Sequence, residues 1–156
     1  MDCKERLVQY LNEHNVRFEA TRHNLAYTAQ EVAAAQHVSG HQMAKVVMVW
    51  AGDQMAMLVV PASGRINFRS AAELVDVKKV RLASETEFSQ LFPDCRVGAM
   101  PPFGNLYGLP VYADSMLIAQ DDMSFRVGTY TETMTISTAD YRRLVQPQEG
   151  QLIYDI

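Results

Sequence analysis

Residues 97–106 constrain this chain more than any other segment, because two adjacent prolines stand between two glycines, Gly98 and Gly104. Each proline fixes its own φ and lacks an amide hydrogen, and Pro102 also keeps Pro101 out of the helical region. Glycine permits turns and close backbone approaches that a side chain would prevent. The segment therefore predicts a stiff loop. It suits either a structural turn between two strands or a pocket wall whose backbone amides face a ligand.

Lys45 is the second informative residue, because it follows a polar turn at residues 40–43 and precedes an apolar, β-branched run. A cation at the start of a strand, next to buried surface, can bind an anion or a carbonyl at a fixed point. A lysine stem can equally cover a sheet while its ammonium group stays in water. The residues alone leave both roles open.

Together these segments resemble the YbaK family, the editing domains associated with prolyl-tRNA synthetase. The resemblance covers nearly the whole chain and rests on the order and spacing of short motifs. It implies an aminoacyl-tRNA deacylase, or a homologue with the same fold and no assigned substrate. The motifs are residues 23–29, Gly40, residues 44–45, 58–61, 80–85, 98–104 and 111–114, Gly128 with Thr129, and residues 139–141.

The resemblance implies that Lys45 orients the substrate and that the loop supplies backbone groups near the scissile carbonyl. The candidate donors are the amides of Gly98, Ala99 and Met100, since proline has none. An aminoacyl ester is already activated, so positioning it, holding a water and stabilising the oxyanion can suffice without a protein nucleophile. The further substrate-binding candidates are His23, Thr28, Pro101, Pro102, Phe103, Gly104, Asp114, Gly128, Thr129 and Tyr130.

Three of these candidates keep a structural alternative. Thr28 also fits a helix N-cap. Asp114 can hydrogen-bond the loop, orient Lys45, or remain a solvated carboxylate at a strand end. Tyr130 stands where many family members have a histidine, and a tyrosine titrates too far above neutrality to move protons easily at pH 7. Tyr130 can reshape the amino-acid pocket, weaken turnover, or be a core aromatic with its hydroxyl at the surface.

The leading hypothesis is a free-standing deacylase that hydrolyses a mischarged tRNA carrying alanine, serine, cysteine or a small non-protein amino acid. A second hypothesis is a binding module that recognises an aminoacyl group or small ligand without turnover. The excess of acidic over basic residues, and Tyr130 in place of the histidine, favour this second hypothesis. A third is a regulatory subunit that acts through a protein partner.

Composition limits the partners. A length of 156 residues with 48% hydrophobic and 21% charged residues predicts a single domain over residues 1–156. The net charge of −4 argues against binding long stretches of DNA or RNA, but allows contact with a tRNA acceptor end.

No apolar run is long enough for a membrane span and no signal peptide is visible, so we expect a cytoplasmic protein without membrane contact. A weak homo-oligomer stays open. The basic residues available for tRNA are Arg65, Arg69, Lys78, Lys79, Arg81, Arg142 and Arg143.

Several kinds of site have no visible motif. The chain has no G-x-S-x-G, Walker A or dinucleotide fingerprint. Cys3 and Cys95 lack a CxxC pattern, so we expect two small apolar residues and no disulfide framework. His37 and His41 share a helical spacing, but no acid lies between them and Gly40 would end a helix there. We therefore expect neither a metal nor a cofactor.

Periodicity and caps predict an α+β fold. Capping-box spacings begin helices at Asp2, Thr28 and Ser84, a short helix covers residues 70–75, and Thr138 caps a last helix. The resemblance implies a mainly antiparallel mixed sheet, strongly curved and barrel-like, flanked by helices. The tail after Pro147 is expected to be the least ordered part. The strand-like segments are residues 16–21, 46–50, 55–60, 77–82, 109–113, 124–127 and 134–136.

Overall fold

The computed structural model describes residues 1–22, 30 and 39–155. The predicted helix that begins at Thr28, the binding candidates His23 and Thr28, and His37 lie outside the described residues. His41 is described, and its Nδ1 lies 3.2 Å from the Ser63 hydroxyl.

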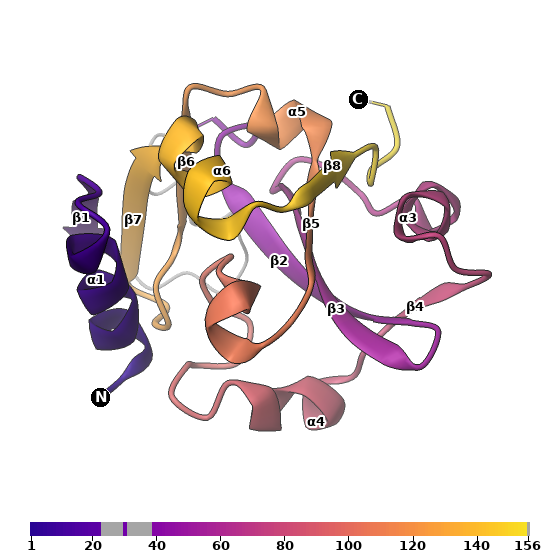
Figure 1. The fold of residues 1–156 in the computed structure, drawn as a ribbon, viewed down its shortest axis with the longest axis horizontal. Coiled ribbons are helices and arrows are strands. Elements are labelled where there is room, and N and C mark those ends of the chain that lie inside the picture. Colours follow the sequence, from indigo (N-terminus) through magenta and orange to yellow (C-terminus); the bar gives the residue numbers. More distant parts are fainter. Residues whose placement is uncertain (23–29, 31–38, 156) are drawn as a thin grey trace.

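Five helices with described bounds surround two sheets (Figure 1). The predicted capping boxes at Asp2 and Ser84 are confirmed, with Glu5 and Glu87 completing them. The last helix begins one residue earlier than predicted. Its N-cap is Ser137, which is extended and accepts from the Asp140 amide, whereas Thr138 is already helical. The bounds are α1 (Cys3–Glu13), α3 (Phe68–Val75), α4 (Glu85–Phe88), α5 (Ser115–Ile118) and α6 (Thr138–Val145), with short 3₁₀ turns η1 (Ser89–Leu91) and η2 (Gly104–Tyr107).

The strands form a five-stranded sheet in the order β4-β2-β3-β5-β8 and a three-stranded sheet in the order β1-β7-β6. All pairs are antiparallel except β3 with β5 and β5 with β8, so the sheets are mainly antiparallel, as predicted. The bounds are β1 (Glu19–Arg22), β2 (Ala44–Ala51), β3 (Gln54–Pro61), β4 (Val80–Leu82), β5 (Val111–Asp114), β6 (Asp122–Arg126), β7 (Glu132–Ser137) and β8 (Gln148–Gly150).

The barrel-like part of the prediction is not supported. Within the described ranges neither sheet closes on itself, because hydrogen bonding stops at β4 and β8 in one sheet and at β1 and β6 in the other. In the described part of the chain, one parallel bridge links the two sheets, between Met43 just before β2 and Ser124 in β6. The contact of two open sheets replaces the continuous curved sheet that the resemblance implied.

The C-terminal tail is also more ordered than predicted. It adds strand β8 beside β5, and Leu152 and Ile153 are buried. The Tyr154 amide then donates to the Arg65 carbonyl at 3.0 Å. The tail is held because it completes both a sheet edge and an apolar cluster.

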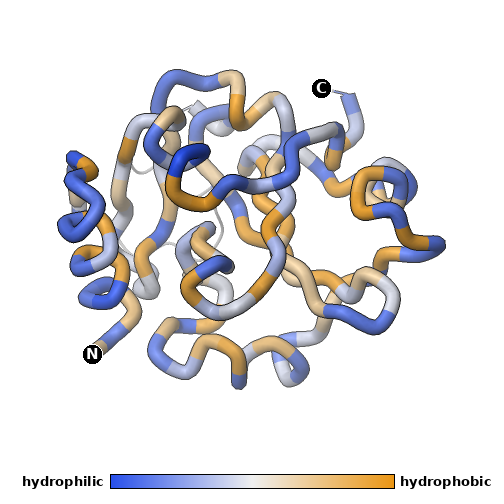
Figure 2. Tube along the Cα trace, in the orientation of Figure 1, coloured by the Kyte–Doolittle hydropathy of each residue, from blue (hydrophilic) through white to orange (hydrophobic). Residues whose placement is uncertain are grey.

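Most residues along β2 and β3 are hydrophobic (Figure 2). Because side chains alternate between the two faces of a strand, they pack into two apolar clusters, one on each face. Met48 and Met57 face the larger cluster, which includes Met100 and Phe103. Val49 and Leu58 face the smaller cluster, under α3 and the C-terminal tail. The two faces of this hairpin therefore pack into different apolar clusters. No helix in the described part of the chain has the length and apolarity to cross a bilayer.

Candidate functional site

The first half of the proline-containing loop depends on a glycine backbone. Gly98 has a φ of +80°, and a Cβ there would meet nothing within 4 Å. Glycine is favoured at this position by the positive φ of the backbone and not by a lack of space for a side chain. The next amide, that of Ala99, donates to the Arg96 carbonyl at 3.0 Å and tightens the turn.

The loop is tied to a second predicted segment, residues 128–130. The Arg96 amide donates to the Gly128 carbonyl at 2.9 Å, and the Gly128 amide donates to the Ala99 carbonyl at 2.7 Å. The Tyr130 hydroxyl donates to the Val97 carbonyl. The structure thus brings Gly98, Ala99, Gly128, Thr129 and Tyr130 together from two separate parts of the sequence.

Gly128→Ala is expected to lower the free energy of unfolding by about 2–4 kcal/mol. Gly128 has a φ of +94°, and a Cβ there would lie 2.6 Å from Cys3 Cβ. Chemical denaturation measures the loss. Gly108→Ala is the matched control, since Gly108 has a φ of +71° but open space around it, and its cost is expected to be only about 1 kcal/mol. Equal losses in both variants would contradict the packing argument.

The second half of the loop is packed into the core. Pro101, Pro102, Phe103 and Gly104 are all buried. The Phe103 ring centroid lies 5.5 Å from that of Phe125 and 5.4 Å from that of Tyr141. This half therefore anchors the loop.

Tyr141 anchors the loop through a contact that the sequence did not predict, although residues 139–141 were among the family motifs. Its fully buried hydroxyl donates to the Pro102 carbonyl at 2.7 Å, and burial raises the pKa of this tyrosine far above its usual value. No local pattern signals such a contact, because Pro102 and Tyr141 meet only when α6 packs on the loop.

The candidate amides differ in what they contact. The Ala99 amide is used within the turn, as above, whereas those of Gly98 and Met100 donate to no acceptor in the described residues. Met100 is nonetheless buried. An amide that is held in place without a protein acceptor is the kind of group that can stabilise an oxyanion.

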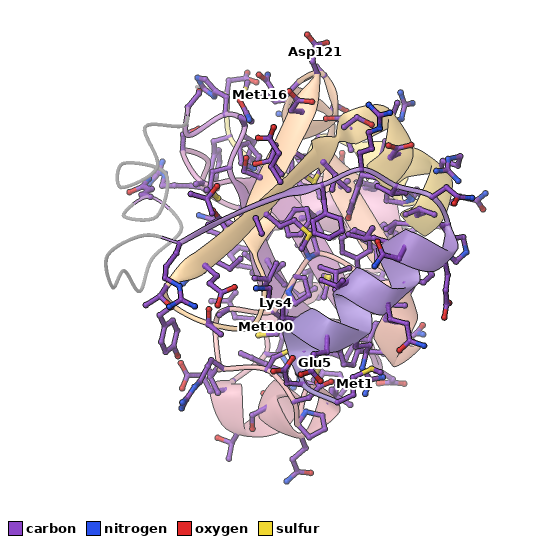
Figure 3. The ribbon with its side chains drawn as sticks, turned by 90° about the vertical axis from the view of Figure 1, so that its left-hand side faces the viewer. Met1, Lys4, Glu5, Met100, Met116 and Asp121 are labelled. Carbon is purple, nitrogen blue, oxygen red and sulfur yellow. A yellow bond between two sulfur atoms is a disulfide. The ribbon has the colours of Figure 1, made fainter. Side chains whose placement is uncertain are left out.

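Thr129 adds an unsatisfied polar atom beside the loop. Its Oγ1 is buried and has no hydrogen-bond partner among the residues that the structure describes. Thr129 also lines a cavity of about 410 Å³ together with Lys4, Arg96 and Glu132. Lys4 and Glu132 form an ion pair, and Figure 3 shows Lys4 on the first turn of α1.

Lys45 lies half-buried near the start of β2. Its ammonium donates to the Gly64 carbonyl at 2.9 Å, and burial lowers the pKa of the side chain. Lys45 is paired with Val60 on the adjacent strand β3, and the Val60 side chain, on the same face of the sheet, packs into the smaller apolar cluster. Lys45 therefore projects on the opposite face of the hairpin from Met100 and Phe103. In the described residues no hydrogen bond joins Lys45 to the loop.

A model of the aminoacyl-tRNA editing domain family matches residues 23–144. The chain belongs to this family. The family resemblance predicted from the motifs is confirmed.

Among curated proteins, the chain is similar to the multifunctional Ser/Thr-tRNA deacylase ProXp-y of Escherichia coli K12, and equally to that of strain O157:H7. Identity is 25% over 149 residues, covering 92% of this chain and 89% of the relative. A crystal structure of a candidate trans-editing enzyme for prolyl-tRNA synthetase shares the fold, with a TM-score of 0.81, 22% identity and 99% of both chains covered. So does the crystal structure of a hypothetical protein, with a TM-score of 0.84, 20% identity, and 96% and 99% covered.

In this editing domain Asp114 is a structural carboxylate. It is 2% exposed, accepts from the Met116 amide at 2.9 Å and from the Leu152 amide at 2.8 Å. The solvated carboxylate considered from the sequence is thus excluded, and no described hydrogen bond links Asp114 to the loop or to Lys45. Asp114 ends β5 and begins α5, so backbone donors satisfy it.

The prediction for the two cysteines is wrong. Cys3 and Cys95 form a disulfide with their Cα atoms 5.1 Å apart. The pairing arises because α1 folds back on the segment before the loop, where the Cys3 amide donates to the Asp94 carbonyl at 3.1 Å. A separation of 92 residues gave no local signal for it.

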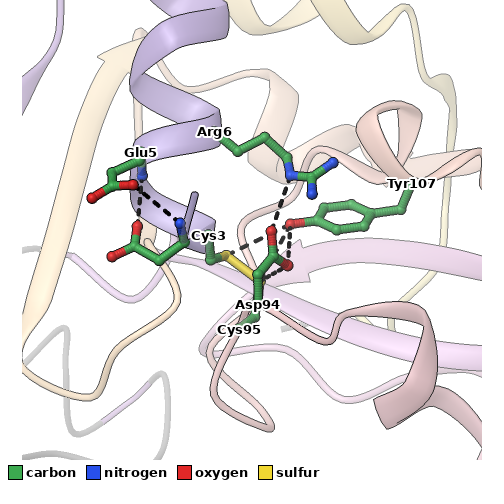
Figure 4. A network of polar contacts seen from close by, with 7 residues as sticks. Cys3, Glu5, Arg6, Asp94, Cys95 and Tyr107 are labelled. Atoms are coloured by element: carbon green, nitrogen blue, oxygen red, sulfur yellow. Dashed lines mark hydrogen bonds and ion pairs between the residues drawn. A yellow bond between two sulfur atoms is a disulfide. The ribbon is translucent and has the colours of Figure 1, made fainter.

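A polar network covers this disulfide (Figure 4). The Asp94 carboxylate accepts from Arg6 Nε at 3.0 Å and from the Tyr107 hydroxyl at 3.1 Å. Burial, with the nearby Asp94 charge, raises the pKa of Tyr107. The network and the disulfide together fix the base of the editing domain's loop to α1.

Proposed function

We propose that this editing domain acts in trans as a deacylase that hydrolyses the ester of a mischarged aminoacyl-tRNA. Family membership over residues 23–144 is the observation that carries the proposal. The relative's name, a Ser/Thr-tRNA deacylase, directs attention to serine and threonine esters, and serine is also among the substrates expected from the sequence.

The proposed chemistry needs no protein nucleophile. A water oxygen attacks the ester carbonyl and loses a proton, the bond to the ribose oxygen breaks, and the ribose oxygen takes up that proton as the free amino acid leaves. The amides of Gly98 and Met100 are the proposed oxyanion donors, since they have no acceptor in the described residues. The turn at Gly98 and the hydrogen bonds to Gly128 and Tyr130 preorganise them.

Lys45 is proposed to hold the substrate rather than to transfer a proton. One of its three N–H groups donates to Gly64, which leaves two for a phosphate or a carbonyl of the acceptor end. Since Lys45 projects away from the loop, its proposed partner is the RNA and not the oxyanion.

The test is a deacylation assay on labelled seryl-, threonyl-, alanyl- and cysteinyl-tRNA, each compared with its rate of hydrolysis in buffer. We expect at least one ester, with serine or threonine first, to be lost more than tenfold faster than in buffer. Saturable binding of these tRNAs without faster loss of any ester would instead support the binding module.

A further inference from the structure

Arg65 and Tyr154 form an exposed pair of a cation and an aromatic ring. The Arg65 guanidinium carbon lies 5.3 Å from the centre of the Tyr154 ring. The backbone holds the pair on both sides, through the hydrogen bond from Tyr154 to Arg65 and the antiparallel bridge between Ile66 and Ile153. Tyr154 is nevertheless 50% exposed, so part of its ring is open to a ligand.

This pair differs from the two other arginine–ring pairs in the described residues. Arg6, over Tyr107, is bonded to Asp94. Arg81, over Trp50, lies 3.8 Å from the Glu87 carboxylate. For Arg65, by contrast, no ion pair occurs within the described ranges, and the exposed Asp155 next to Tyr154 does not provide one. The charge of Arg65 is therefore available to an outside anion.

The pair also adjoins Lys45. The carbonyl that accepts from the Lys45 ammonium belongs to Gly64, the residue immediately before Arg65. Further along, α3 begins with Phe68, which is 37% exposed, and the exposed Arg69. A local gathering of cations and rings stands out on a chain whose net charge is −4.

We propose that Arg65 and Tyr154 form a stacking platform for an unpaired nucleotide at the 3′ end of the tRNA. The inference rests on the proposed function, because it places the RNA beside Lys45. Proteins bind single-stranded RNA by stacking bases on exposed rings and guanidinium planes, with cations on the phosphates. The platform would hold one unpaired base of the 3′ end while the Lys45 ammonium contacts a neighbouring phosphate or carbonyl of the acceptor end.

The test measures Kd for uncharged tRNA with an intact 3′ end and for the same tRNA lacking its unpaired 3′ nucleotides. Tyr154→Ala is expected to raise Kd for the intact tRNA about tenfold, as loss of one stacked base does, and to leave Kd for the shortened tRNA unchanged. Arg65→Ala should act in the same direction. Tyr154→Phe keeps the ring and should stay within about twofold of the parent.

Arg81→Ala is the matched control, because it removes the same charge from another arginine–ring pair. It is expected to affect intact and shortened tRNA equally. The inference is overturned if Tyr154→Ala binds intact tRNA like the parent, or if it weakens both tRNAs alike.

The binding comparison also separates this inference from the proposed function. It uses uncharged tRNA, so it gives an answer even if no ester is hydrolysed. If hydrolysis depends on Lys45 while Tyr154→Ala leaves Kd unchanged, the platform alone is wrong. If Tyr154→Ala weakens only intact tRNA and no ester is lost, the platform stands and the deacylase does not.

Discussion

Lys45→Ala is expected to lower the rate constant of deacylation at least about a hundredfold while leaving the domain folded. The ammonium is the group that positions the substrate in our proposal, and misplacing a bound ester by about 1 Å can have an effect of this size. The fold should persist, since the variant loses one hydrogen bond from a half-buried side chain, worth about 1 kcal/mol. Single-turnover hydrolysis and urea denaturation measure the two effects.

Lys45→Met and Lys45→Arg refine this test. Methionine keeps an aliphatic chain over the sheet without the charge, so it should be as inactive as alanine. Arginine keeps the charge with a different donor geometry and should recover part of the rate. A folded Lys45→Met protein that hydrolyses esters at the parent rate would show that the ammonium has no part in the reaction.

Replacing Cys3 and Cys95 together by serine is expected to lower the free energy of unfolding by about 2–4 kcal/mol. The disulfide closes a 92-residue separation, so in the oxidised unfolded chain it removes much conformational freedom. Urea denaturation under oxidising conditions measures the difference. The disulfide also packs against Gly128, so part of the loss comes from the contact between α1 and the segment at residues 128–130.

Reduction provides the control for the disulfide. Under excess thiol the parent should lose most of this extra stability and approach the double serine variant. Each single variant, Cys3→Ser and Cys95→Ser, should match the double variant in oxidising buffer. A parent that unfolds at the same urea concentration with and without thiol would contradict a stabilising disulfide.

Local patterns predicted much of the fold correctly. The apolar runs on either side of residues 51–54 became the β2–β3 hairpin, because hydrogen bonding and turn chemistry there are local. The capping boxes at Asp2 and Ser84 were also confirmed, since their donors and acceptors lie within three residues. The short strand β8 was missed because its partner β5 is distant in the sequence.

Local patterns predicted only part of the candidate site. The motifs indicated the segments around Gly98 and Gly128, but not that hydrogen bonds join them. The sequence did not predict the burial of Asp114, because the Leu152 amide that donates to it comes from the C-terminal tail. The face on which Lys45 projects depends on strand register, which sequence patterns alone did not specify.

The sequence by itself determined the family, the α+β class and the place of the proline-containing loop, since each depends on residue types in short, ordered stretches. The tertiary structure decided the Cys3–Cys95 disulfide, the anchoring of Pro102 by Tyr141, and the pairing of Arg65 with Tyr154. These contacts join residues that are far apart along the chain. They form only when packing brings the segments together, so no local pattern could predict them.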